Sequence, residues 1–211
     1  MICVSISRWQ QLEQVLDSGA GFLELRMDLI RKDPEDVFSL LPEHVKTIVT
    51  CRPDVYNEAE RMRLLKSSMD LGATYVDVEL ESTDAYLNAL AAHAGDQGTK
   101  LIVSYHNFEL TPETEELETL LQNCYERGGD LAKIAVQVHS REDVGKLMDL
   151  YRLPGKKVII GMGKLGRISR VMGPYLGAEF TFAAPGKGGE TAPGQLSYDQ
   201  LRSIYKVIDE S

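Results

Sequence analysis

The sequence predicts an α/β protein, a compact (β/α)8 TIM barrel that occupies residues 1–211 as a single domain. Three observations carry this prediction: β-branched runs number eight, amphipathic stretches separate them, and the repeat is about 25 residues long. Strands that alternate with helices become parallel neighbours, because each helix returns the chain to the same edge of the sheet. An open doubly wound sheet usually has about five or six strands, so eight units favour a closed barrel.

Each expected strand is rich in Val, Ile, Thr or Tyr and is short enough to be buried in a barrel wall. The eight runs are ICVSI (2–6), FLELRMDL (22–29), KTIVTC (46–51), TYVDVEL (74–80), KLIVSYH (100–106), LAKIAV (131–136), KVIIGM (157–162) and AEFTFA (178–183).

The stretches between these runs favour helices, and several of them end in glycine, as helix C-termini often do. We expect helices within 9–19, 59–72, 85–95, 114–129, 141–153 and 197–211. The second and seventh connections, 34–42 and 167–177, look shorter. A barrel of this kind typically takes about 250 residues, so a chain of 211 must be a trimmed version.

Composition narrows the possible functions. The chain holds 23 Lys and Arg against 32 Asp and Glu, and a net charge of −9 argues against nucleic-acid binding. The first residues resemble no signal peptide, and no apolar run approaches the ~20 residues of a membrane helix. Three scattered cysteines form no metal-binding pattern. We therefore expect a cytoplasmic protein with reduced thiols and neither a membrane nor a metal partner.

Charged residues alternate along two of the expected strands. Glu24, Arg26 and Asp28 lie on the second strand, and Asp77 and Glu79 lie on the fourth. Alternate residues of a strand share one face, so each set points to one side of the barrel wall. The active site of such a barrel lies at the C-terminal ends of its strands, which is where these residues fall.

Lys133 is the most informative residue, because it interrupts the apolar sixth strand. A buried lysine is costly unless it is paired or neutral. One interpretation is a structural ion pair with Asp77 or Glu79. The other is an amine nucleophile that forms a Schiff base with a carbonyl substrate, since burial or a second cation favours the reactive neutral amine.

His106 ends the fifth strand and is expected one barrel unit from Lys133. A histidine in that position can shuttle protons, although a lone histidine is more often an ordinary surface or core residue. Arg26, Arg52 and Arg170 converge on the same mouth; together they suggest a substrate with a carboxylate or several hydroxyls, and singly each could be a barrel salt bridge. The Gly-rich stretch 185–195 lacks the spacing of a nucleotide-binding P-loop.

The motifs, taken in order, resemble a known family. FLELRMD, TCR, YVDVEL, SYHNFELTP, AKIAV, GRISR and APGQLS, which together extend from near the start of the chain to its last helix, are similar to those of the type I 3-dehydroquinate dehydratases. The resemblance implies a (β/α)8 barrel of the shikimate pathway and of aromatic amino-acid biosynthesis, usually a homodimer. Such a hydro-lyase converts 3-dehydroquinate to 3-dehydroshikimate through an imine on lysine, without a cofactor.

The resemblance also implies roles for individual residues. Lys133 would form the Schiff base, and His106 would act as general base and acid. Arg170 would hold the substrate carboxylate. The remaining substrate-binding positions are Ser5, Glu24, Arg26, Arg52, Thr191 and Gln195, of which the last two lie in the lid.

One segment departs from the family pattern. The family usually has Glu-Gly-Gly after the segment that ends at Arg52, and its glutamate orients the histidine; here the chain reads Pro-Asp-Val-Tyr-Asn-Glu. We expect Glu58 to take that role, with Asp54 and Asp77 as alternatives.

Two other functions remain possible at this point. A class I aldolase would use the same lysine, and the glycines at 186, 188 and 189 could bind the phosphate of its substrate. A non-catalytic barrel would bind a ligand without turnover, although the presence of both Lys133 and His106 argues against it.

Overall fold

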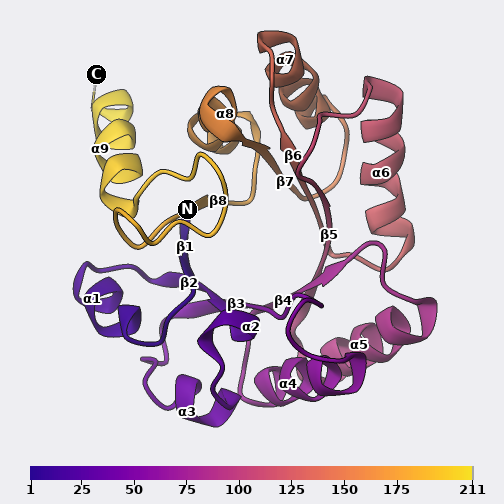
Figure 1. Ribbon diagram of the computed structural model, residues 1–211, viewed down its shortest axis with the longest axis vertical. Coiled ribbons are helices and arrows are strands. Elements are labelled where there is room, and N and C mark those ends of the chain that lie inside the picture. The colour runs from indigo at the N-terminus through magenta and orange to yellow at the C-terminus, as the bar shows by residue number, and fades with distance from the viewer. Residues whose placement is uncertain (211) are drawn as a thin grey trace.

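A computed structural model describes residues 1–210, and its eight parallel strands form a nearly closed barrel (Figure 1). The predicted (β/α)8 fold is therefore confirmed. The strands are β1 (Ile2–Ile6), β2 (Phe22–Arg26), β3 (Lys46–Thr50), β4 (Tyr75–Glu79), β5 (Lys100–Asn107), β6 (Leu131–Gln137), β7 (Lys157–Met162) and β8 (Thr181–Ala183).

Each strand from β1 to β6 pairs with the next one along the chain, and β1 also pairs with β8. Between β7 and β8, the amide of Glu179 donates to the carbonyl of Lys157 at 3.2 Å. The register places Lys133 level with Ser104, and Ser104 level with Glu79. These three side chains therefore lie at one height in the barrel wall, on neighbouring strands.

Helices form a ring outside the strands (Figure 1). They are α1 (Gln11–Asp17), α2 (Met27–Ile30), α3 (Pro34–Phe38), α4 (Glu58–Asp70), α5 (Asp84–Gln97), α6 (Thr114–Glu126), α7 (Arg141–Asp149) with the 3-10 turn η1 (Leu150–Arg152), α8 (Gly163–Leu176) and α9 (Tyr198–Asp209). Across residues 1–210, no helix has both the length and the apolar character needed to cross a membrane.

Apolar side chains occupy two layers. The larger layer lies between the strands and the helices, and the smaller one fills the interior of the barrel. In the interior, the rings of Phe22 and Phe180 meet edge to face at 5.0 Å. This aromatic cluster belongs to the packed barrel interior, on the N-terminal side of the charged residues.

The second strand is shorter than predicted. β2 ends at Arg26, and the chain turns at once into the four-residue helix α2, which contains Asp28. Asp28 is therefore not on the strand face; its two oxygens accept from Arg26 at 3.0 and 2.6 Å. β8 also begins later than predicted, at Thr181.

The seventh connection is not short, contrary to the prediction. α8 begins at Gly163 and has 14 residues, with Gly166 inside it. A Cβ on Gly166 would lie 2.3 Å from the carbonyl carbon of Gly161 in β7, so the helix packs this closely only because both residues are glycine. The glycines look like helix breakers in the sequence, yet they bring α8 against the barrel.

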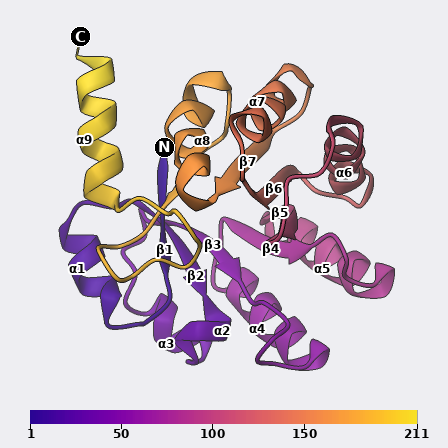
Figure 2. The same cartoon turned by 45° about the horizontal axis from the view of Figure 1, so that its top comes forward.

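The loop between β8 and α9 lies beside β1 and the N-terminal end of α8 (Figure 2). The amide of Gly163 donates to the carbonyl of Pro193 at 3.1 Å, which fixes the loop to α8. Gly194 has a φ of +76°, and a Cβ there would lie 2.3 Å from the carbonyl oxygen of Gly163. The loop thus folds back over the mouth at a position that only glycine can occupy.

Candidate active site

A cavity of about 350 Å³ opens at the C-terminal ends of the strands. The structure brings together there all but one of the residues that the sequence analysis selected. Those that line the cavity are Ser5, Glu24, Arg26, Arg52, His106, Lys133, Arg170, Thr191 and Gln195.

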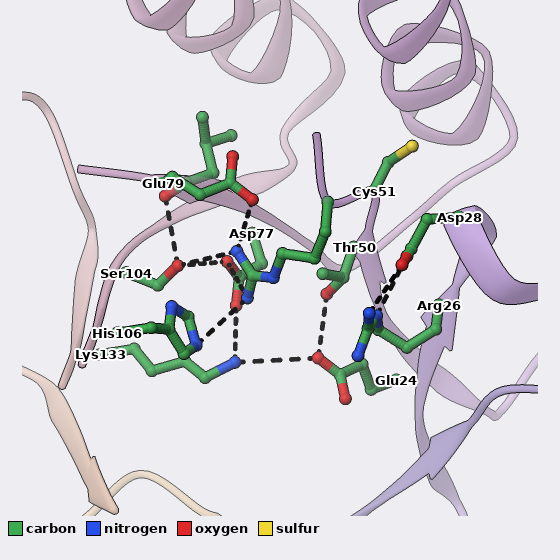
Figure 3. A network of polar contacts seen from close by, with 12 residues as sticks. Glu24, Arg26, Asp28, Thr50, Cys51, Asp77, Glu79, Ser104, His106 and Lys133 are labelled. Atoms are coloured by element: carbon green, nitrogen blue, oxygen red, sulfur yellow. Dashed lines mark hydrogen bonds and ion pairs between the residues drawn. The ribbon is translucent and has the colours of Figure 1, made fainter. Parts of the chain in front are cut away.

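Lys133 is buried at the floor of this cavity, with 6% of its surface exposed. Its Nζ lies 2.8 Å from Oδ2 of Asp77 and 3.7 Å from Oε1 of Glu24, and Figure 3 shows it between the two carboxylates. The ring of Phe182 lies 4.4 Å below the amine. The ion pair considered from sequence is thus present, and it involves Asp77 rather than Glu79.

Asp77 is the centre of the polar network. It is fully buried, its Oδ1 accepts from the hydroxyl of Ser104 at 2.6 Å, and the same oxygen lies 3.0 Å from the guanidinium of Arg52. Burial alone would raise the pKa of this carboxyl, but Arg52 and Lys133 outweigh it and hold the pKa well below its usual range. Asp77 is therefore ionised at every pH at which an enzyme normally works.

His106 lies at the end of β5, with Arg52 NH2 3.4 Å from its Nε2. Because a guanidinium can only donate, this contact requires a lone pair on Nε2. Burial, then Arg52 and Lys133, lower the pKa of His106 well below 6.5, although Asp77 opposes them. The ring of Phe108 stacks on the imidazole at 6.2 Å. The arrangement keeps the imidazole neutral and able to accept a proton.

The charges around the Lys133 amine cancel. Four cations and four carboxylates are joined by ion pairs of 2.6 to 3.7 Å, together with one shorter contact between Arg61 and Glu79. The cations are Arg26, Arg52, Arg61 and Lys133, and the carboxylates are Glu24, Asp28, Asp77 and Glu79.

Arg170 is the exception to this pairing. It is only 1% exposed, and its NH1 donates to the carbonyl of Phe182 at 3.3 Å. Its Nε and NH2 have no hydrogen-bond partner among residues 1–210. Burial lowers the pKa of Arg170 to about 10, so the group stays protonated at neutral pH. An unpaired buried guanidinium is costly, and an anion that enters the cavity would remove that cost.

Amide and hydroxyl groups of the loop complete the wall beside β1. Gln195 donates from Nε2 to the hydroxyl of Ser5 at 3.3 Å. Its Oε1 accepts from the amide of Thr191 at 2.8 Å and from the Thr191 hydroxyl at 3.2 Å. This side of the cavity therefore presents groups suited to the hydroxyls of a ligand.

The structure does not bring Glu58 to His106. Glu58 is exposed, is the first residue of α4 after the N-cap Asn57, and does not line the cavity. Asp54 lines the cavity but is also exposed. Of the three carboxylates considered, Asp77 is the one whose charge acts on His106.

Three further residues of the site were not predicted. Ser104 and Phe182 contact Asp77 and Lys133, and Arg61 approaches the network from α4. Ser104 lies two residues before His106, so strand alternation could have indicated it. Arg61 lies on a helix that looks ordinarily amphipathic, and only the tertiary structure reveals its direction.

The fold and the cavity define a barrel enzyme whose site combines a buried amine, a neutral imidazole and an unpaired guanidinium. The whole chain from residue 2 to residue 211 matches the family model described as type I 3-dehydroquinase. The chain belongs to the type I 3-dehydroquinase family, which is a family of hydro-lyases.

Relatives and solved structures agree with this membership. A 3-dehydroquinate dehydratase of Methanocaldococcus jannaschii is 32% identical, with 99% of each chain covered. A second, from Methanococcus maripaludis, is 38% identical over 89% of this chain and 88% of its own length. The crystal structure of the 3-dehydroquinate dehydratase from Aquifex aeolicus superposes with a TM-score of 0.86 at 31% identity, with 98% of each chain covered.

Proposed function

We propose that this protein converts 3-dehydroquinate to 3-dehydroshikimate through a Schiff base on Lys133, with His106 as general base and acid. The step would serve aromatic amino-acid biosynthesis in the shikimate pathway. The single observation that carries the proposal is the cavity itself, where the Lys133 amine, His106 and the unpaired Arg170 line one space of about 350 Å³.

Arg170 supplies the orientation. Its Nε and NH2 are placed to donate hydrogen bonds to the oxygens of the substrate carboxylate, and the other cations of the site are already paired with carboxylates. Gln195, Thr191 and Ser5 then face the hydroxyl groups of the ring. A substrate with one carboxylate and several hydroxyls fits this distribution of groups.

Lys133 supplies the electron sink. Its neutral amine adds to the C3 carbonyl, and the carbinolamine loses its hydroxyl as water to leave a protonated imine. The imine cation replaces the ammonium between Asp77 and Glu24, so the two carboxylates stabilise the charge before and after this step. The cation at C3 withdraws electrons and acidifies the adjacent C2–H bond.

His106 carries the protons. Its neutral imidazole takes the C2 proton to give an enamine, and the resulting imidazolium then donates a proton to the C1 hydroxyl, which leaves as water. Attack of water on the conjugated imine finally releases 3-dehydroshikimate and returns the free amine. The one water consumed in this hydrolysis balances the one released when the imine forms, so the net change is the loss of one water from the substrate.

Borohydride trapping tests the proposal. Incubation with 3-dehydroquinate and borohydride should reduce the imine and leave a stable adduct on the peptide that contains Lys133, as detected by mass spectrometry. Lys133→Met should abolish both the adduct and the rise in ultraviolet absorbance from the conjugated product. An adduct on another lysine, or full turnover by the Lys133→Met variant, would refute the role of Lys133.

We also propose that the protein is a cytoplasmic homodimer. Its three cysteines are buried and unpaired, which suits a reducing compartment. Leu165, Ile168, Met172 and Tyr175 form an exposed apolar stripe on α8, which a second copy would cover. Light scattering should give twice the monomer mass for the wild type and the monomer mass for Ile168→Glu; a monomeric wild type would contradict the assembly.

A further inference from the structure

We propose that Arg61, on α4 outside the barrel, is a positioning residue that acts through Glu79 to hold Arg52 against His106. This inference rests on the proposed function, because it assigns Arg61 a part in the same reaction. Arg61 does not line the cavity, so it acts without touching the substrate.

The surroundings of Arg61 fix its position. Only 6% of its surface is exposed, although it lies on a helix. Its Nε donates to the carbonyl of Cys51 at 2.7 Å, and its NH2 pairs with Oε2 of Glu79. The guanidinium also lies 5.2 Å from the centre of the Tyr86 ring. Exposed ion pairs of Lys and Arg contribute little to stability and are mobile. The Arg61 guanidinium, in contrast, is enclosed by the Cys51 carbonyl, Glu79 and the Tyr86 ring.

Glu79 transmits this position to the site. Its second oxygen, Oε1, accepts from NH1 of Arg52 at 2.7 Å. The other nitrogen of Arg52 lies 3.0 Å from Asp77 and 3.4 Å from His106. A single carboxylate therefore joins the helix arginine to the arginine that contacts the imidazole, and each guanidinium occupies one oxygen.

The effect on His106 follows from charge and geometry together. The charged groups that act on the imidazole are Arg52 beyond β3, Lys133 on β6, Asp77 on β4 and Arg26 on β2. Without Arg61, one carboxylate of the network has no matching cation, and Glu79 is free to draw Arg52 away from Nε2. Both changes stabilise the imidazolium, so both raise the pKa of His106 and reduce the neutral base at a given pH.

The segment after Arg52, which lacks the Glu-Gly-Gly of the family, bears on this role. The loop after Arg52 does not bring a carboxylate from Glu58 to His106, and the guanidinium of Arg52 contacts the ring instead. Holding the long Arg52 side chain against His106 costs rotamer entropy. Further contacts to Arg52 must offset that cost. Arg61 and Glu79 provide that support from outside the cavity.

The test compares Arg61→Met with Arg61→Lys and with a control on the same helix. Arg63→Met is the matched control, since Arg63 is exposed and pairs only with Asp33 at 3.1 Å. Two readouts are needed: kcat and KM with 3-dehydroquinate across pH, and the NMR titration of the His106 imidazole in the free protein. The second readout requires no turnover, so it tests the inference even if the proposed reaction is wrong.

Arg61→Met should lower kcat at neutral pH by about 10- to 100-fold with little change in KM, because misplacing a supporting group costs rate rather than binding. The His106 titration should move up by about one pH unit. Arg61→Lys should recover most of both effects, since an ammonium still pairs with Glu79, and Arg63→Met should change neither. Should Arg61→Met fail to fold, Arg61→Gln, which keeps a donor for the Cys51 carbonyl, replaces it. A folded variant with a wild-type His106 titration and wild-type kcat would overturn the inference.

Discussion

The two sides of the barrel mouth differ in whether their buried cations are paired with carboxylates. From β2 to β6, every cation at the floor of the site is matched by a carboxylate, and Lys133 is held by Asp77 and Glu24. Around α8 and β8, Arg170 is as deeply buried, but two of its nitrogens have no hydrogen-bond partner within the described residues 1–210. The charges of the paired side are matched within the protein, whereas an anionic ligand would supply the missing partner on the other side.

This contrast separates two tasks. In the proposed reaction, the paired side would balance the positive charge of the Lys133 nitrogen while that nitrogen changes from ammonium to imine and back. On the other side, the buried guanidinium of Arg170 carries a desolvation cost, and in the proposed reaction an anionic substrate would offset it better than a neutral one. Variants on the two sides should therefore differ in stability as well as in rate.

The largest expected effect on rate beyond Lys133 comes from His106 on the paired side. His106→Asn keeps a polar group of similar size but removes the base, so kcat should fall by about 10²- to 10⁴-fold while KM changes little. Steady-state assays that follow the conjugated product would measure this change. Asparagine cannot accept a proton, so an unchanged kcat would show that another group performs the proton transfer.

Arg52 and Arg170 test the contrast directly. Arg52→Met leaves Asp77 and Glu79 each short of a partner, so the free energy of unfolding should fall by about 3–5 kcal/mol. Arg170→Met removes an unpaired buried charge, so the free energy of unfolding should rise by roughly 1–3 kcal/mol. Urea denaturation of both variants without substrate provides the measurement.

Arg170→Met should also weaken the use of substrate, although it stabilises the fold. Arg170→Met should lower kcat/KM by about 10- to 100-fold, since a charged hydrogen bond to the substrate contributes roughly 1.5–3 kcal/mol. A variant that is both more stable and less active would identify Arg170 as a ligand-binding group rather than a structural one. Loss of stability in both variants would contradict the division of the mouth into two sides.

Much of this site could be predicted because strands impose a simple rule. Strand alternation placed Glu24, Asp77 and Lys133 on inward faces, and the TIM barrel brings strand ends together at one mouth. Position within a loop or on a helix follows no such rule. Glu58 was selected by its place in the chain, yet it is the exposed first residue of α4, next to the N-cap Asn57.

Arg61 and the glycines of α8 are features that the sequence analysis did not predict and the structure reveals. The sequence analysis did not select Arg61, yet the structure buries it beside Glu79. The predicted connection 167–177 left out Gly166, but this glycine lies inside α8, where its lack of a Cβ allows the close approach to Gly161 of β7. Both features depend on distances between segments far apart in the chain, which periodicity does not encode.

The lowered pKa of His106, on the paired side of the mouth, predicts how activity and stability depend on pH. Because the folded-state pKa of His106 lies well below 6.5, the acid limb of kcat/KM should also lie below pH 6.5. The unfolded chain binds this proton more readily, so stability should be complete above pH 6.5 and should decline as the pH falls below it. Urea midpoints between pH 5 and 7 should show a shallower decline for His106→Asn; identical slopes would contradict the assignment.

The smallest expected effect is that of Glu58→Gln, and Glu79→Gln is its matched comparison. Glu58→Gln should leave kcat and KM within about twofold of the wild type, since Glu58 is exposed and surface substitutions rarely exceed 0.5 kcal/mol. Glu79→Gln makes the same chemical change but weakens contacts to both Arg52 and Arg61, so kcat should fall by about 10-fold or more. Parallel assays of the two variants decide which carboxylate supports the histidine. If Glu58→Gln were the more damaging change, the loop after Arg52 would have to close over His106 during turnover, and the support for the imidazole would come from that loop rather than from α4.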